Sequence, residues 1–199
     1  MSVKKSIEEC NGIFFITLTC CRWLPLFEIS NGYDAVYRWF DNLKSHGHFI
    51  LGFAIMPNHV HALIAFRHTR GEPINRLIGT GKRFMAYFIV KRLKEIGQFD
   101  LLDRLEQMVK PYERRKGKQH EIFEPSFDWK ECTSEKFIIQ KLNYIHENPC
   151  QGKWQLATAP QEYKHSSAKF YVEGEHRCYP VISYEDLQDI DLTKWIEEE

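Results

Sequence analysis

The 199-residue chain contains no long apolar run, no internal repeat and no low-complexity segment, and its formal net charge is zero. A membrane helix needs roughly 20 consecutive apolar residues, so we expect no membrane-spanning segment. Residues 1–10 are polar and charged, and they lack the apolar core of a signal peptide. With 43% hydrophobic residues, the chain is expected to be a cytoplasmic protein built around one hydrophobic core.

The six cysteines include no Cys-x-x-Cys pair, the spacing that is typical of many structural metal sites. Cys20 and Cys21 are adjacent, and adjacent residues on a strand point to opposite faces of a sheet. They would therefore form a poor chelate. We expect reduced thiols that are mostly buried.

The zero net charge is the sum of two opposed blocks. Residues 76–118 contain twelve Lys and Arg against five Asp and Glu, whereas residues 173–199 contain two against nine. A basic block favours contact with a polyanion such as nucleic acid. A solvated helix face followed by a charged loop would have the same composition.

The order of apolar periodicities predicts an α+β fold. Strands are expected at 12–21, 48–56, 59–66 and 121–129, and helices at 32–46, 74–96, 101–109 and 133–148. The pattern β-α-β-β-α-β is that of a ferredoxin-like sandwich, an antiparallel sheet with helices packed on one face. We expect this domain to span residues 1–160, followed by a C-terminal appendage, 161–199, with an acidic tail.

Two histidines follow the predicted turn in the segment Met-Pro-Asn-His-Val-His, residues 56–61. Residues at i and i+2 of a strand share a face, so His59 and His61 project together. Two imidazoles on one face can hold a divalent ion, although two hydrogen-bonded structural histidines would show the same pattern.

A tyrosine stands near the end of the last predicted helix, in Asn-Tyr-Ile-His-Glu-Asn-Pro, residues 143–149. The proline forces the helix to stop, and Asn148 lies four residues after Tyr144, on the same helical face. A phenol can attack phosphorus if a bound cation offsets the negative charge. An aromatic residue on the core face of an amphipathic helix is the alternative interpretation.

These two segments, with Phe14 to Thr19 and the downstream run Glu162 to Ala168, resemble the single-tyrosine HUH transposases, in particular the branch called REP-associated tyrosine transposases. The resemblance covers roughly residues 12–171. It implies an HUH endonuclease fold and a homodimer that acts on single-stranded or hairpin DNA. The implied reaction cleaves and rejoins DNA through a 5′-phosphotyrosine.

The resemblance also assigns roles to residues. It makes Tyr144 the nucleophile and His59 and His61 the metal ligands, and it places Asn148 where relatives have a glutamine as third ligand. An amide oxygen suits Mg²⁺ or Mn²⁺, but His146 or a water can serve instead. Phosphate contacts are expected from the basic block; the candidates are Arg76, Lys82, Arg83, Arg114, Arg115, Lys116 and Lys118.

Two other functions compete with the transposase interpretation. A non-catalytic DNA-binding protein could have kept the same fold. A nucleotide phosphohydrolase of the histidine-triad type would need a third histidine at position 63, where this chain has Leu63.

Overall fold

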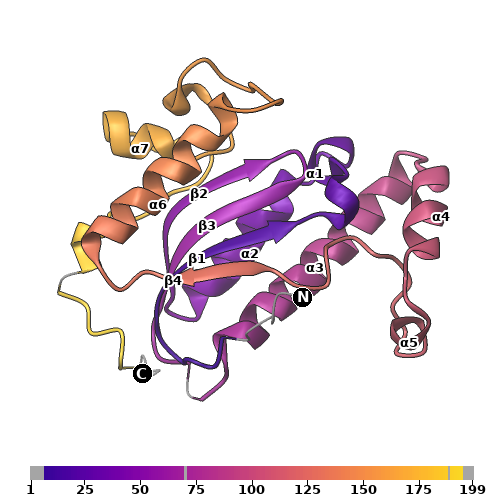
Figure 1. Ribbon diagram of the computed structural model, residues 1–199, viewed down its shortest axis with the longest axis horizontal. Helices are drawn as coiled ribbons and strands as arrows, with labels where there is room; N and C mark the ends of the chain where they lie inside the picture. The colour runs from indigo at the N-terminus through magenta and orange to yellow at the C-terminus, as the bar shows by residue number, and fades with distance from the viewer. Residues whose placement is uncertain (1–6, 70, 188, 195–199) are drawn as a thin grey trace.

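A four-stranded antiparallel sheet forms the centre of the computed structural model, which describes residues 7–69, 71–187 and 189–194 (Figure 1). The strands are β1 (Gly12–Thr19), β2 (Phe49–Met56), β3 (His59–Phe66) and β4 (Asp128–Glu131), in the order β2-β3-β1-β4. The main helices are α2 (Tyr33–Ser45), α3 (Ile74–Glu95), α4 (Phe99–Gln107) and α6 (Glu135–Glu147). The α+β class and the antiparallel sheet are therefore confirmed.

Shorter helices connect these elements. They are η1 (Cys21–Trp23), α1 (Leu26–Ile29), α5 (Pro111–Arg114), η2 (Asn148–Cys150), η3 (Pro160–Glu162), α7 (Ala168–Glu173) and η4 (Glu185–Leu187). The predicted boundaries of the long elements agree with the structure to within two residues. The segment 110–119, expected to be a loop, contains the single turn α5.

The two faces of the sheet carry two separate cores, because alternate residues of a strand point to opposite sides. On β1, Phe14 and Ile16 belong to one core and Phe15 to the other. On β3, Val60 and Ala62 face the first core. The second face therefore receives the odd-numbered residues of both strands, including the two histidines.

Helices α2 and α3 cover the first face, as the sandwich pattern predicts (Figure 1). They approach each other closely at Gly81, where a Cβ atom would lie only 2.2 Å from Trp39 Nε1. A glycine at this position of α3 therefore lets the Trp39 ring of α2 fill the interface.

Helix α6 covers the opposite face, with Ile138, Leu142 and Ile145 in the second core. Helices therefore lie on both faces of the sheet. The pattern β-α-β-β-α-β predicted helices on one face only, because it ends before α6. At Gly52 of β2, a Cβ atom would lie 2.5 Å from Leu142 Cδ2. The missing side chain lets α6 settle against the sheet.

The fourth strand begins later than expected. Residues 121–124 make only isolated contacts, with the end of β1 and with other segments: Cys21 N donates to Ile122 O, Glu121 N donates to Leu105 O, and Glu124 N donates to Thr19 O. Pro125 has no N–H to donate to a ladder. Regular pairing with β1 therefore starts only at Asp128.

The region after residue 160 packs on the free edge of β2. Ile55 N donates to His165 O, and Ser167 N donates to Phe53 O. The Tyr163 hydroxyl donates to Ile55 O at 2.7 Å. Farther along, Tyr179 enters the first core and Leu187 the second.

No helix in the described part of the chain is long and apolar enough to cross a membrane. The last residues of the acidic tail, 195–199, and the charged residues 1–6 lie outside the described ranges.

Candidate active site

The tight turn between β2 and β3 places both histidines at the start of β3, on the α6 face of the sheet. His59 and His61 are 6% and 3% exposed, so their rings are shielded by neighbouring side chains. Their Nε2 atoms lie 3.1 Å apart. The i, i+2 spacing therefore brings two ring nitrogens to one point, as the sequence predicts.

The neighbouring Asn58 fixes which nitrogen of His59 carries the proton. The Asn58 Nδ2 group donates to Trp23 O at 3.2 Å, so its Oδ1 atom faces His59 Nδ1, at 2.7 Å. An amide oxygen only accepts hydrogen bonds, so His59 Nδ1 must donate. The lone pair of a neutral His59 is therefore on Nε2, the atom that faces His61.

Thr17 plays the corresponding role for His61. It lies directly across the ladder from His61, and its Oγ1 atom is 2.9 Å from His61 Nδ1. A hydroxyl can either donate or accept. Thr17 can therefore support His61 with its proton on either nitrogen, including the form in which both Nε2 lone pairs are available.

Burial keeps both imidazoles neutral at ordinary pH. It lowers the pKa of His59 to about 4, an effect that a side-chain hydrogen bond to Asn148 partly offsets. Burial also lowers the pKa of His61 well below its usual value, helped by the nearby His59 and by the positive charge of Lys141. Neutral imidazoles are the form that binds metal ions.

Tyr144 comes from α6 in the same chain. Ser134 caps this helix by accepting a hydrogen bond from Phe137 N at 3.4 Å. The Tyr144 ring packs edge-on against His61, with centroids 5.1 Å apart, and against Phe15 at 5.8 Å. Tyr144 is nevertheless 48% exposed, so its ring borders the histidine pair while part of it stays open to solvent.

Lys141 brings a positive charge to the same place. Its Nζ atom lies 4.7 Å from the centre of the Phe15 ring and 5.6 Å from that of Tyr144. Ammonium groups are attracted to the faces of aromatic rings. Phe15 also stacks on His61, with centroids 5.4 Å apart. Lys141, Tyr144 and His61 therefore all contact the Phe15 ring.

Asn148 and His146 differ in position. Asn148 is half-buried just after α6, and its side chain interacts with His59. His146 Nε2 instead lies 2.8 Å from Ser167 Oγ, which also accepts a hydrogen bond from Phe53 N at 2.9 Å. This pairing commits His146 to anchoring α6 on β2, which leaves Asn148 as the side chain that adjoins the histidine pair.

The donor set fits a divalent cation. Two neutral imidazoles aim Nε2 at one point, oxygen atoms hold their Nδ1 atoms, and an amide that can offer an oxygen adjoins His59. Within the described ranges there is no cluster of three or more His, Cys, Asp or Glu that could hold a metal. Among the described residues, a cation at this point would be held by the two histidines, with Asn148 as the adjoining amide.

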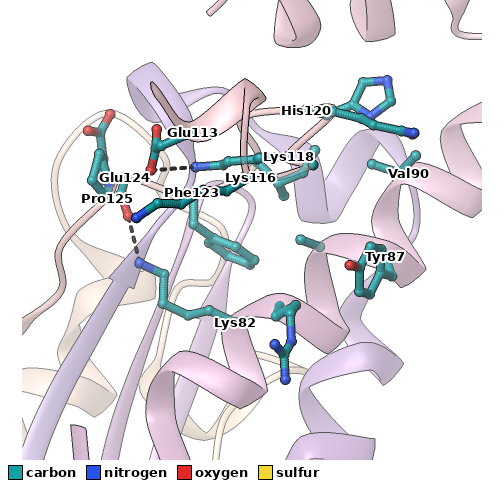
Figure 2. A pocket seen from close by; sticks show the side chains of 15 residues that line it. Lys82, Tyr87, Val90, Glu113, Lys116, Lys118, His120, Phe123, Glu124 and Pro125 are labelled. Atoms are coloured by element: carbon teal, nitrogen blue, oxygen red, sulfur yellow. Dashed lines mark hydrogen bonds and ion pairs between the residues drawn. The ribbon is translucent and has the colours of Figure 1, made fainter. Parts of the chain in front are cut away.

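The basic block lines a different surface. A groove of about 570 Å³ lies between α3 and residues 113–125, and Figure 2 shows Lys82, Lys116 and Lys118 around it. Lys82 Nζ donates to Glu124 O at 2.6 Å, and Glu124 N donates to Thr19 O at 2.9 Å. Thr19 in turn pairs with His59 across the ladder, so Glu124, which lines the groove, is hydrogen-bonded to the strand next to His59.

Some of the basic residues predicted to contact phosphate pair with carboxylates of the chain, and others are exposed. Arg76 pairs with Glu72 at 3.0 Å, Arg114 pairs with Glu106 at 3.8 Å, and Lys118 pairs with Glu113 and Glu121. Arg83, Arg115 and Lys116 are exposed, and Lys116 and Arg83 line the groove. Four of the basic residues therefore line the groove: Lys82 and Arg83 of α3, and Lys116 and Lys118 of the segment that faces it. Arg76, Arg114 and Arg115 are not among the lining residues.

The fold is similar to that of a REP-associated tyrosine transposase whose structure contains a bound REP hairpin. The alignment covers all of both chains with a TM-score of 0.58 and 14% sequence identity. A candidate transposase from Deinococcus radiodurans aligns with 69% of this chain and 90% of its own, with a TM-score of 0.40 and 18% identity. No protein-family profile and no curated protein sequence matches the chain. The first likeness shows a shared fold.

Sequence reasoning missed four residues that build the site: Thr17, Trp23, Asn58 and Lys141. Two of them had a usable signal. Lys141 is three residues before Tyr144, a spacing that places both on one side of a helix, and Asn58 adjoins His59 directly. Thr17 and Trp23 depend on the pairing of β1 with β3 and on the turn after β1, which the sequence pattern does not specify.

Proposed function

We propose that this protein is a DNA strand transferase that cleaves and rejoins single-stranded DNA through a covalent bond to Tyr144. The observation that carries the proposal is the contact between the rings of Tyr144 and His61, which joins two distant segments of one chain. A half-exposed phenol beside buried neutral imidazoles suits attack on a phosphate better than a purely structural role. The shared fold with a transposase supports the same reaction class.

The reaction needs no external energy source. The Tyr144 oxygen attacks phosphorus, the bond from phosphorus to the 3′ oxygen breaks, and the phenol proton is lost while the departing 3′ oxygen gains one. The strand downstream stays attached as a 5′-phosphotyrosine. A second 3′-hydroxyl attacks that phosphorus, forms a new phosphodiester and returns the proton to Tyr144, so the bond energy is conserved.

The chain's own groups stabilise the charge that develops in this reaction. The Lys141 ammonium lies beside Tyr144 and would attract both a phenolate and the phosphate oxygens. His59 and His61, with Asn148 as an oxygen donor, would hold a divalent cation such as Mg²⁺ or Mn²⁺. When bound there, such an ion would supply Lewis-acid stabilisation of the phosphate.

The substrate class follows from the surface around the site. Basic side chains of α3 and of residues 113–118 suit a phosphate backbone, and Glu124 in the lining of their groove is hydrogen-bonded to Thr19 of β1. A structural neighbour was determined with a REP hairpin. We therefore propose that single-stranded DNA next to a hairpin is the substrate and that the protein acts as a homodimer.

The test is formation of a covalent adduct. Single-stranded DNA covering the flanks of the protein's own gene, labelled at the 3′ end, is incubated with the protein and Mg²⁺ or Mn²⁺, then resolved under denaturing conditions. We expect a labelled protein band that is abolished by Tyr144→Phe and by chelation. An adduct that survives in Tyr144→Phe would contradict the nucleophile, and tight DNA binding without cleavage would favour the non-catalytic alternative.

A further inference from the structure

Trp23 is a large aromatic side chain held at the surface beside the histidine pair. It ends η1, the turn that follows β1, and it is 57% exposed. Its ring meets the His59 ring edge-on, with centroids 5.6 Å apart. The side chain therefore borders the site on the side of His59, whereas Tyr144 borders it on the side of His61.

The backbone that presents this ring is unusual. Arg22 and Trp23 have φ angles of +49° and +58°, a left-handed conformation that residues other than glycine seldom adopt twice in succession. Trp23 N donates to Cys20 O at 3.0 Å, and Arg22 N donates to the Glu124 carboxylate at 2.8 Å. Such strain persists only where the surroundings impose it, and it clusters at functional sites.

One buried amide ties Trp23 to the site. Asn58 has no exposed surface; its Nδ2 atom donates to Trp23 O, and its Oδ1 atom accepts from His59 Nδ1. The same side chain therefore holds the backbone of Trp23 and the imidazole of His59.

We propose that Trp23 stacks on a nucleobase of single-stranded nucleic acid, next to the phosphate that Tyr144 would attack. This inference rests on the proposed function, because it assigns a neighbouring nucleotide to the same substrate. Stacking on an exposed aromatic ring is how proteins hold single strands without reading a particular base. Arg22, next to Trp23, donates a hydrogen bond to the Glu124 carboxylate, and Lys82 in the groove donates to Glu124 O. The nucleic-acid strand would therefore continue from Trp23 past these residues onto the basic surface.

The experiment tests whether loss of the Trp23 ring and loss of one particular base weaken binding through the same contact. All proteins carry Tyr144→Phe so that no strand is cleaved, and binding of fluorescein-labelled single strands is measured by anisotropy at low salt. A series of oligonucleotides covers the cleavage position, each with one abasic nucleotide. The variants are Trp23→Ala, Trp23→Phe and, as a matched control, Phe99→Ala, which removes a ring of similar exposure, 60%, from α4.

We expect one abasic position to weaken binding by the Trp23 protein about 5- to 150-fold, the range of one base stack. Trp23→Ala should weaken binding of the intact strand by the same factor and become insensitive to that abasic position. Trp23→Phe should keep most of the affinity, and Phe99→Ala should behave like the parent. Full affinity in Trp23→Ala, or an unchanged abasic effect in it, overturns the inference.

Failure of the inference can be told apart from failure of the proposed function. If Trp23→Ala stays sensitive to the abasic position while the unmutated protein forms a normal adduct, only the stacking role of Trp23 is rejected. Clear coupling together with no adduct under any condition rejects the transferase and keeps the stacking site. No binding of any single strand rejects both.

Discussion

The ring of Tyr144 packs against the ring of His61 within one chain, with centroids 5.1 Å apart and planes inclined by 63°. Each chain therefore contains a complete candidate site, whatever its oligomeric state. A mixture of Tyr144→Phe and His61→Ala proteins should form no covalent adduct with DNA, because neither chain has both residues. Recovery to a quarter of the activity of the unmutated protein would instead show that the site forms between chains.

Thr17→Val tests the support of the histidine pair. Valine has nearly the shape of threonine but cannot hold the Nδ1 atom of His61, which lies 2.9 Å from the Thr17 hydroxyl. Loss of such a supporting hydrogen bond typically costs 10- to 100-fold in metal affinity. We expect a fall of about that size in Mn²⁺ affinity, measured by titration calorimetry. Thr19→Val, the same change two residues on, is the control and should bind Mn²⁺ normally.

Lys141→Met tests the role of the positive charge beside Tyr144. Methionine keeps much of the apolar packing on Phe15 but removes the ammonium, which lies 5.6 Å from the Tyr144 ring centre. We expect adduct formation to slow by about 10-fold or more, as is common when one electrostatic contact is removed, with an unchanged melting temperature. Lys141→Arg should restore most of the rate. Equal rates in all three proteins would reject the electrostatic role.

The sequence alone predicted the features that depend on residues close together in the chain. The alternation in β1 and β3 and the histidine spacing predicted the shared face of His59 and His61, and the proline at 149 predicted the end of α6 near Asn148. These features depend only on strand or helix geometry. The position of Tyr144 beside His61 could not be obtained from local geometry, because it depends on which face of the sheet α6 covers.

Long-range pairing explains the other differences between prediction and structure. The predicted strand at 121–129 is found only at Asp128–Glu131, because residues 121–124 bond to Cys21, to Leu105 and, by a single hydrogen bond, to Thr19 at the end of β1. Likewise, the role of Thr17 follows from its register with His61, which no pattern within β1 reveals. Such contacts join residues far apart in sequence, so single-segment periodicity carries no information about them.

Gly52→Ala tests whether close docking of α6 positions Tyr144. The added methyl group would lie 2.5 Å from Leu142 Cδ2, two residues before Tyr144, and 3.5 Å from Ser167 Oγ. Relief of this contact requires the buried Leu142 side chain to move, and we expect α6 to shift with it. The result should be a folded protein whose rate of adduct formation falls by about 10-fold or more, since small misplacement of reacting groups is costly. Gly79→Ala is the control, because nothing lies within 4 Å of its added Cβ, and its rate should be unchanged.

His48 is expected to make the protein less stable in acid. It is 4% exposed, its Nδ1 atom has no hydrogen-bond partner among the described residues, and burial, with a smaller contribution from His46, lowers its pKa to about 4. An unfolded histidine has a pKa near 6.5, so between these values the unfolded chain binds more protons than the folded one. The stability that His48 contributes is therefore complete above about pH 6.5 and is lost as the pH falls toward 4.

The size of this effect can be measured with His48→Leu, which fills a similar volume without a titrating group. A single histidine with this shift would lower the free energy of unfolding by about 2 kcal/mol between pH 6.5 and 4.5. Urea unfolding at both pH values should show at least that loss in the unmutated protein, because the buried His59 and His61 also have lowered pKa values. His48→Leu should be less sensitive to pH by about 2 kcal/mol. His176→Gln, which removes an exposed imidazole, should keep the original dependence. An identical pH dependence in His48→Leu would show that the buried His48 is not the cause, because the variant lacks the only group that links this position to proton binding.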